Sequence, residues 1–140
     1  MFDLKTIELS AEAIASAENQ GSNGGRKPLL WLERGAEDDA YEYGVYLVNN
    51  TGETLDYVDF GTITAVKVDD DAYVSGNSGR RYENVPQGTG VKVEQIHIVY
   101  DSDYLITIDL RVKSALLGER EFRHFVSRAN MHYKALLREE

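Results

Sequence analysis

The clearest pattern in the sequence is a run of five apolar residues that lie two positions apart: Tyr104, Ile106, Ile108, Leu110 and Val112. Three of the four residues between them are polar. A repeat of two is the repeat of a β-strand, whose side chains point alternately to its two faces. The pattern therefore predicts a strand over 104–112 with one buried face.

Shorter runs with β character lie on both sides of this stripe. We expect strands over 28–32, 41–49, 55–68, 73–74, 80–85, 91–100 and 119–126. About seven or eight strands separated by Gly, Asp and Asn turns favour a sandwich or a barrel over βαβ units. We predict a mainly β fold, an antiparallel β-sandwich that is similar in outline to immunoglobulin-like sandwiches, although it lacks their Cys…Trp…Cys hallmark.

Three details of the strands can be predicted from the same pattern. The turn Asn50-Thr51-Gly52 predicts that the strand after it returns antiparallel to the strand before it. Gly61, inside the long run 55–68, predicts a bulge or a bend. Near Glu94 and Gln95 the apolar period slips, which predicts either a bulge or a strand that is buried on both faces.

Both ends of the chain show helical features. Ser10 is a suitable N-cap for the alanine-rich stretch that follows, so a short helix is expected there. After Ser127, a second possible cap, the apolar spacing predicts a C-terminal helix. We therefore expect one β domain over 1–140, made of an arm, a short helix and a flexible loop (1–27), the sandwich core (28–126) and a helix (127–140).

The distribution of charge is uneven. The 140 residues carry a formal net charge of −9, and all of this excess lies in residues 1–70, which contain 5 Lys/Arg and 14 Asp/Glu. Overall acidity makes nucleic acid an unexpected partner, because phosphate contacts need positive potential. The chain has no cysteine, which excludes disulfides and thiolate sites and fits a reducing compartment. Residues 1–20 lack the pattern of a signal peptide, and no window approaches a membrane span, so we expect a cytoplasmic protein.

Metal and cofactor chemistry finds little support in the sequence. His97, His124 and His132 are spread over different predicted elements, whereas zinc ligands usually come in close pairs. Carboxylates in β loops can bind calcium, and a weaker alternative places such a site at Asp69, Asp71, Asp101 and Asp103. No cofactor is expected.

Enzymatic function also finds little support. No Gly-x-Ser-x-Gly elbow occurs, and 24 acidic residues always allow some pair to be imagined. We therefore expect a protein that is not an enzyme, although a hydrolase with two titratable groups in a deep pocket stays open.

Nine tyrosines and the acidic first half instead favour a binding function. Tyrosine is common at recognition surfaces because it offers rigid apolar area with a polar tip, although β propensity also explains its presence in strands. We predict a non-catalytic interaction module that binds a protein partner, and a homodimer is plausible through exposed strand edges. The alternative is a domain that binds a small molecule or a carbohydrate. The predicted surface contains Glu37, Asp38, Asp39, Tyr41, Tyr43 and Tyr46.

Overall fold

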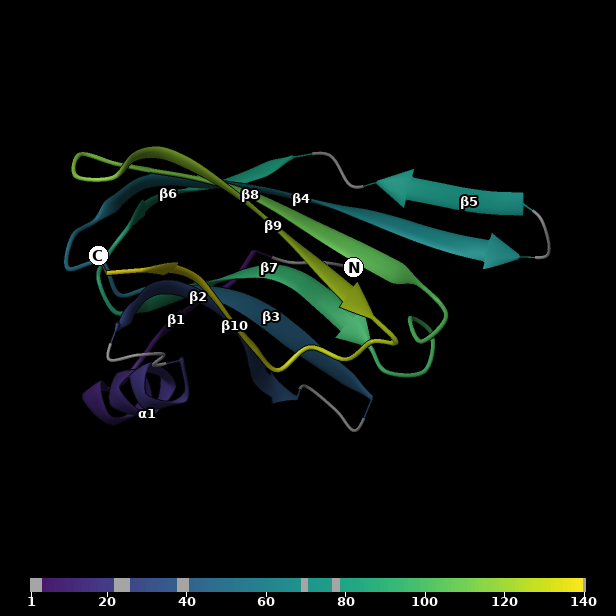
Figure 1. Ribbon diagram of the computed structural model, residues 1–140, viewed down its shortest axis with the longest axis horizontal. Helices are drawn as coiled ribbons and strands as arrows, with labels where there is room; N and C mark the ends of the chain where they lie inside the picture. The colour runs from purple at the N-terminus through teal and green to yellow at the C-terminus, as the bar shows by residue number, and fades with distance from the viewer. Residues whose placement is uncertain (1–3, 22–25, 38–40, 69–70, 77–78, 140) are drawn as a thin grey trace.

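The computed structural model describes residues 4–21, 26–37, 41–68, 71–76 and 79–139, which form two antiparallel sheets packed face to face with one helix on the outside (Figure 1). Along the chain the elements are β1 (Thr6–Glu8), α1 (Ala11–Gly21), β2 (Pro28–Glu37), β3 (Glu42–Asn49), β4 (Leu55–Val68), β5 (Asp71–Gly76), β6 (Arg80–Val85), β7 (Thr89–His97), β8 (Leu105–Ser114), β9 (Gly118–Ser127) and β10 (Tyr133–Arg138). The first sheet has the order β1-β7-β3-β2-β10. The second has the order β5-β4-β8-β9, and β6 also pairs with β4. The predicted β-sandwich is confirmed.

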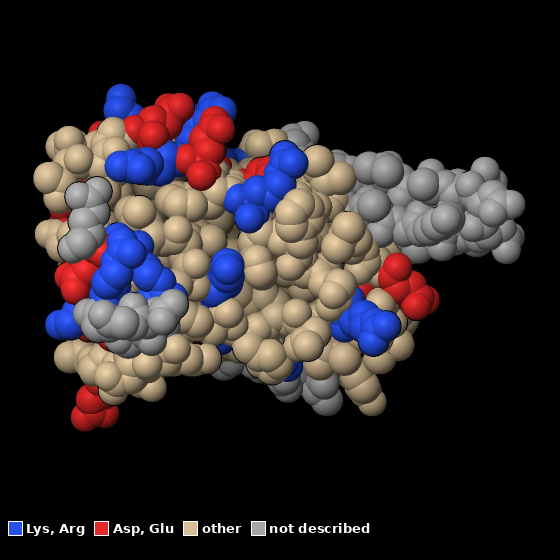
Figure 2. Space-filling model, in the orientation of Figure 1, with Lys and Arg blue, Asp and Glu red and all other residues tan. Residues whose placement is uncertain are grey.

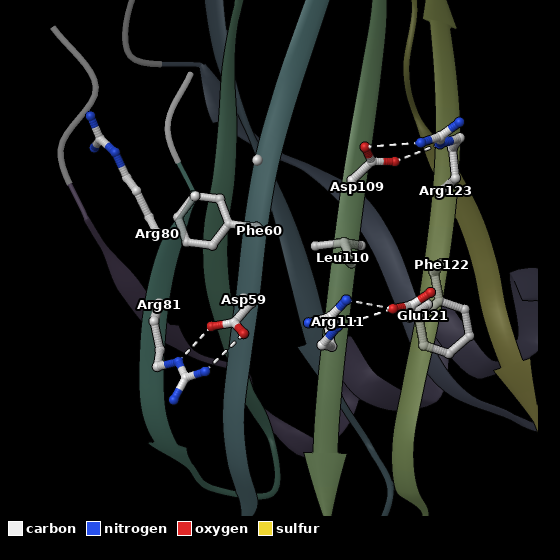
Figure 3. Close-up of a pocket in the computed structure, with 12 residues that line it drawn as sticks. Asp59, Phe60, Arg80, Arg81, Asp109, Leu110, Arg111, Glu121, Phe122 and Arg123 are labelled. Carbon is white, nitrogen blue, oxygen red and sulfur yellow. Dashed lines mark hydrogen bonds and ion pairs between the residues drawn. The ribbon is translucent and has the colours of Figure 1, made fainter. Parts of the chain in front are cut away.

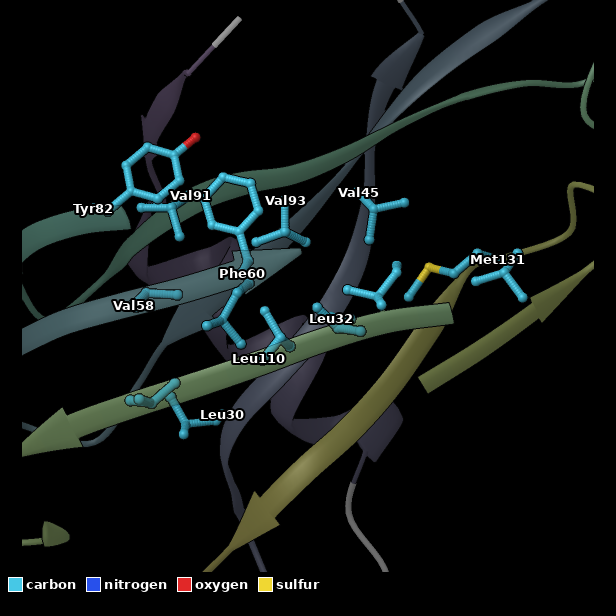
Figure 4. Close-up of a cluster of buried hydrophobic side chains, with 14 of the residues drawn as sticks. Leu30, Leu32, Val45, Val58, Phe60, Tyr82, Val91, Val93, Leu110 and Met131 are labelled. Atoms are coloured by element: carbon cyan, nitrogen blue, oxygen red, sulfur yellow. The ribbon is translucent and has the colours of Figure 1, made fainter. Parts of the chain in front are cut away.

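Strand β8 confirms the period-two prediction and lies in the middle of the second sheet. It pairs with β4 on one side and with β9 on the other. Its inward side chains, from Ile106 to Val112, are at most 3 % exposed. They meet buried residues of the first sheet such as Leu32 and Val93 in one shared core (Figure 4). This core holds the two sheets together.

The phase slip in β7 has both of the predicted causes. Opposite β3, Glu94 pairs with Val45 and Lys92 pairs with Tyr46, so Val93 is an extra residue and forms a bulge. The residues around the bulge are also buried on both faces of the strand.

The bulge directs one carboxylate into the interior. Glu94 pairs with Val45, whose side chain belongs to the core, so Glu94 lies on the inward face. It is 9 % exposed and accepts hydrogen bonds from the Gln95 backbone at 2.8 Å and from the Thr62 side chain of the opposite sheet. Burial raises the pKa of Glu94 above its ordinary value, because a buried carboxylate loses its hydration.

The turn at 50–52 was predicted to return the chain antiparallel to β3, and this prediction is wrong. Strand β4 instead crosses to the second sheet, where it pairs with β8, β5 and β6. The buried Asn49 side chain holds this crossover: its Nδ2 donates to the carbonyls of Glu53 and Val85, and its Oδ1 accepts from Thr51. A buried amide with all these partners stabilises the path of the chain at this crossover.

Gly61 marks a change of neighbour along β4. Before it, residues 55–60 pair with β6, and after it residues 63–68 pair with β5. On the opposite edge the pairing with β8 runs through Gly61 without a register shift. No bulge therefore lies at this position in the pairing with β8.

The C-terminal helix predicted over 127–140 is wrong, because this segment forms strand β10 beside β2. Arg128 and Ala129 adopt left-handed φ angles of 56° and 54°, which end β9 and exclude a helix that starts at Ser127. A register shift leaves Leu136 unpaired between Ala135 and Leu137. Because Leu136 is an extra residue in the strand, Leu136 and Leu137 are adjacent in the sequence. Their adjacency breaks the period of two and resembles the spacing of a helix.

The predicted N-terminal helix is confirmed and covers part of the outer face of the first sheet. Ser10 caps α1 through its hydroxyl, which accepts from the Ala13 backbone at 3.1 Å. Ala17 of α1 packs on Trp31 and Val48 in a second, smaller core. The described part of the chain contains no helix with the length and apolar character needed to cross a bilayer.

Candidate functional site

The three tyrosines of the predicted surface lie in three different environments. Tyr43 is fully buried in the core between the sheets. Its hydroxyl donates to the Ala129 carbonyl at 2.7 Å and accepts from the Met131 backbone at 3.1 Å. Burial raises the pKa of Tyr43. This tyrosine therefore fixes the segment between β9 and β10 and does not belong to a binding surface.

Tyr46 is also buried, at 5 % exposure, but on the outer face of the first sheet. Its ring covers Gly35 of β2 and lies beside Gly44 of its own strand: a Cβ at Gly35 would be 2.4 Å from Tyr46 Cε1. The two glycines leave the space that the ring fills. The sequence did not reveal this role, because it depends on the pairing of β2 with β3.

Tyr41 is exposed and belongs to an aromatic stack that the sequence analysis missed. We call Tyr41, His97 and Tyr100 the aromatic stack. The ring centroids of Tyr41 and His97 are 6.1 Å apart at an interplanar angle of 12°, and those of His97 and Tyr100 are 4.0 Å apart at 18°. Tyr41 is 57 % exposed and Tyr100 is 75 % exposed. These rings come together because β3 and β7 are neighbours, and the Ile98 backbone donates to the Tyr41 carbonyl.

The turn after β7 holds the stack in place. His97 Nδ1 accepts from the backbone of Val99 at 3.2 Å and of Tyr100 at 2.9 Å. The Asp101 carboxylate in turn accepts from the His97 backbone at 2.7 Å. The imidazole is thus hydrogen-bonded to the main chain of its own turn. The same turn carries Tyr100, and it is joined to the backbone of Tyr41 through Ile98.

The predicted acidic residues do not converge on one site in the described structure. Asp38, Asp39 and Asp69 lie outside the described residues, Glu37 ends β2, and Asp71 begins β5. Asp101 caps the turn after β7, and Asp103 is exposed in the same turn. In the described ranges no group of three His, Asp or Glu residues is arranged to hold a metal ion.

A second candidate site is the outer face of the second sheet, where side chains of opposite sign alternate. Figure 2 shows acidic and basic groups mixed along the upper edge of the molecule, over β8 and β9. Cross-strand pairing aligns Arg81 of β6, Asp59 of β4, Arg111 of β8 and Glu121 of β9 in one row. Neighbours along this row have opposite charges, which stabilises cross-strand pairs.

The arginines of this face bind carboxylates on neighbouring strands. Arg81 donates to Asp59 through Nε and Nη2, and Arg123 donates to Asp109 in the same two-pronged way (Figure 3). Arg111 donates to Glu121 at 2.6 Å. The guanidinium of Arg81 holds the pKa of Asp59 below its usual range, because it stabilises the ionised carboxylate.

These ion pairs surround a hollow of about 760 Å³ on the outer face. Gly61 and Gly79 lie in its lining, and the absence of side chains there opens the space between the pairs. Phe60 also lines the hollow, but it alternates with Asp59 and is 4 % exposed, so its ring belongs to the core. Phe122 of β9 lines the hollow as well, and it packs against the same core.

An apolar patch continues from the hollow toward the end of the sandwich. Ile63 of β4 and Phe125 of β9 flank Thr107 of β8 in the row beyond Gly61. Ile63 is 41 % exposed, Phe125 is 57 % exposed and Leu105, further along β8, is 43 % exposed. The outer face of the second sheet thus combines matched charges, a hollow and exposed apolar side chains.

Comparisons of this chain with protein-family models, with curated proteins and with solved structures found no match.

Proposed function

We propose that this protein is a non-catalytic interaction module that binds a protein partner through the aromatic stack. The observation that carries the proposal is the stack of three rings at the end of the sandwich, in which Tyr41 and Tyr100 are exposed and the half-buried His97 lies between them. Exposed tyrosines offer large contact area at a low cost in side-chain entropy, and such residues dominate many recognition surfaces.

The rigidity of the stack supports this role. The His97 ring is fixed by two backbone donors, and Asp101 fixes the start of the same turn. Side chains that are already ordered lose little freedom when a partner binds, which improves affinity. The stack therefore has the pre-organisation expected of a recognition site.

The charges around the stack favour a basic partner. Asp101 and Asp103 lie in the turn that carries Tyr100, and Glu42 directly follows Tyr41. The whole chain has a formal net charge of −9, which attracts cationic partners over a distance and accelerates their association. Arginine and lysine side chains can also bind the faces of tyrosine rings through cation–π contacts. A segment rich in arginine has the chemistry that fits these groups.

A binding experiment with defined peptides tests the proposal. The probe is a fluorescein-labelled peptide in which arginine alternates with glycine, and fluorescence anisotropy reports its binding. The double variant Tyr41→Ala/Tyr100→Ala should weaken binding roughly tenfold or more, because it removes the aromatic contact and leaves the net charge unchanged.

The matched control is Leu116→Ala, since Leu116 and Tyr100 are both 75 % exposed. This variant should bind the peptide like the unmodified protein. Equal affinity of the double variant and the control would show that only long-range charge attracts the peptide, and the stack would then not be a recognition site.

The cytoplasm remains the proposed location, because the absence of cysteine fits a reducing compartment.

The proposal of a non-enzymatic function is supported by the hollow on the second sheet, where the carboxylates of Asp59, Asp109 and Glu121 are bound to arginines. A carboxylate in such a pair is a poor general base, because the arginine stabilises its ionised form.

A further inference from the structure

The row of charges on the second sheet has a symmetry of its own. At the level of Asp59 the sheet has four strands, in the order β6-β4-β8-β9, and they present Arg81, Asp59, Arg111 and Glu121. The signs along the row are plus, minus, plus and minus. Because the row has four members, each charge has the opposite sign to the charge at the same position counted from the other end.

This property makes the face complementary to itself. We consider a second copy packed face to face, related by a two-fold axis that runs parallel to the strands between β4 and β8. The axis places β6 opposite β9 of the second copy and β4 opposite its β8. Arg81 then faces Glu121 of the second copy, and Asp59 faces its Arg111. A two-fold interface must match one patch with itself, and this row satisfies that requirement.

The shape of the next rows agrees with the same axis. Phe125 protrudes from β9 and is 57 % exposed. The axis places it opposite the β5 position that pairs with Ile63, which is Gly76. Arg123 likewise faces the side of the hollow where Gly61 and Gly79 lie. The protruding side chains of one edge therefore meet glycine positions at the other edge.

The area is also sufficient for a specific dimer. Four strands about 4.8 Å apart and about nine residues long, at about 3.4 Å per residue, span roughly 600 Å². Two copies would bury about 1,200 Å² in total, which is the lower end of the range for stable interfaces. Glu83 and Glu119, which lie on the same edge strands as Arg81 and Glu121, would face each other with like charge, and these pairs oppose the interface.

We infer that the outer face of the second sheet is the interface of a homodimer with this two-fold axis. The inference does not depend on the aromatic stack, which lies at a different place on the molecule. The dimer carries two copies of the stack, and two linked binding sites increase the overall affinity for a partner that reaches both.

Charge reversal tests the register of the interface. The unmodified protein should be a dimer by size-exclusion chromatography with light scattering and by sedimentation velocity. Asp59→Arg and Arg111→Asp should each be monomeric at the same concentration, because each change places two like-charged pairs across the axis. Lys134→Asp on the first sheet is the matched control for reversal of a basic residue and should remain a dimer.

Mixing the two monomeric variants is the decisive step. In a heterodimer the arginine introduced at position 59 of one variant would face the aspartate introduced at position 111 of the other. The natural Arg111 and Asp59 would face each other as before. An equimolar mixture should therefore form a dimer, although neither variant does so alone. Restoration requires that both variants are folded, which circular dichroism checks independently.

Three results would overturn the inference: a monomeric unmodified protein, single variants that stay dimeric, or a mixture of folded variants that stays monomeric. A variant that loses its fold is replaced by the milder pair Asp59→Asn and Arg111→Gln, which should each raise the dimer Kd about tenfold. None of these results affects the peptide-binding test of the aromatic stack.

Discussion

The outer faces of the two sheets both carry aromatic side chains, but these side chains are buried on the first sheet and exposed on the second. On the first sheet, Trp31 is fully buried beneath α1. On the second sheet, Phe125 is 57 % exposed, and among the described residues no helix or strand covers it. The helix covers part of the first face, whereas the second face carries ion pairs around an open hollow.

The two faces therefore contribute differently to the stability of the fold. A sheet face that is covered by its own helix contributes apolar burial to folding. A face that keeps arginine–carboxylate pairs at the surface contributes little to folding, because solvent screens exposed charges. Substitutions on the second face should therefore cost little stability.

The largest expected effect is the difference between two aromatic deletions. Trp31→Ala should reduce the free energy of unfolding by about 3–5 kcal/mol, because it leaves a cavity under α1. Phe125→Ala should stay within about 0.5 kcal/mol at a protein concentration where the chain is monomeric. Urea denaturation followed by circular dichroism measures both, since Trp31 is the only tryptophan and its removal abolishes that fluorescence. Equal losses would contradict the contrast between the two faces.

A smaller effect is expected from glycine substitutions on the same two faces. Gly35→Ala should reduce the free energy of unfolding by about 1–3 kcal/mol, because the new Cβ would be 2.4 Å from the Tyr46 ring. Gly79→Ala is the matched control, since the nearest atom to its new Cβ, the Phe60 carbonyl oxygen, is 4.0 Å away. Thermal unfolding of both variants makes the comparison.

A double variant shows whether the ring is the cause. Tyr46→Ala removes the atoms that would clash, so adding Gly35→Ala to it should cost little more. Additive losses in the double variant would show that Gly35 is required for another reason.

The smallest expected effect is on the pH dependence of stability. The pKa of Glu94 is raised in the folded protein, so folding is weakened as the pH rises above the ordinary value for glutamate. Glu94→Gln should therefore be more stable than the unmodified protein at neutral pH, and this difference should vanish in acid. Urea denaturation over a pH series measures the difference, and a gain that is independent of pH would contradict the assignment.

Asp59 on the exposed face provides the opposite case. Its pKa is lowered by Arg81, so its ionised form stabilises the fold at neutral pH and this contribution is lost as the pH falls through the lowered value. Asp59→Asn should be less stable than the unmodified protein at neutral pH and should approach it in acid. The two variants should thus differ in sign over the same pH series.

The parts of the fold that the sequence predicts well are those with a simple local repeat. The apolar residues of the stripe from Ile106 to Val112 all point inward and are buried, so its period of two survives in the structure. Ser10 before the alanine-rich stretch predicts the start of α1 because a cap is a local interaction. Strand β10 was predicted as a helix because the bulge at Leu136 breaks its period.

The candidate sites depend on pairing between distant strands, and this is why the sequence could not predict them. Tyr41 and Tyr100 share a site only because β3 lies next to β7. Tyr43 and Tyr46 lie on opposite faces of β3, as a period of two requires, but the contact of Tyr46 with Gly35 depends on the pairing of β2 with β3. The row of four charges from Arg81 to Glu121 can be recognised only when the order of the strands β6, β4, β8 and β9 is known.

The pairing of β10 with β2 also has a consequence during synthesis. Residues near 135 complete the edge of a strand that begins at residue 28, so more than a hundred residues must leave the ribosome before that edge is closed. Until then the nascent chain exposes the backbone donors and acceptors of β2, which is the kind of edge that invites aggregation. Folding dominated by such distant contacts is slow, so this edge stays open longer than the edge of a strand that pairs with its neighbour in sequence.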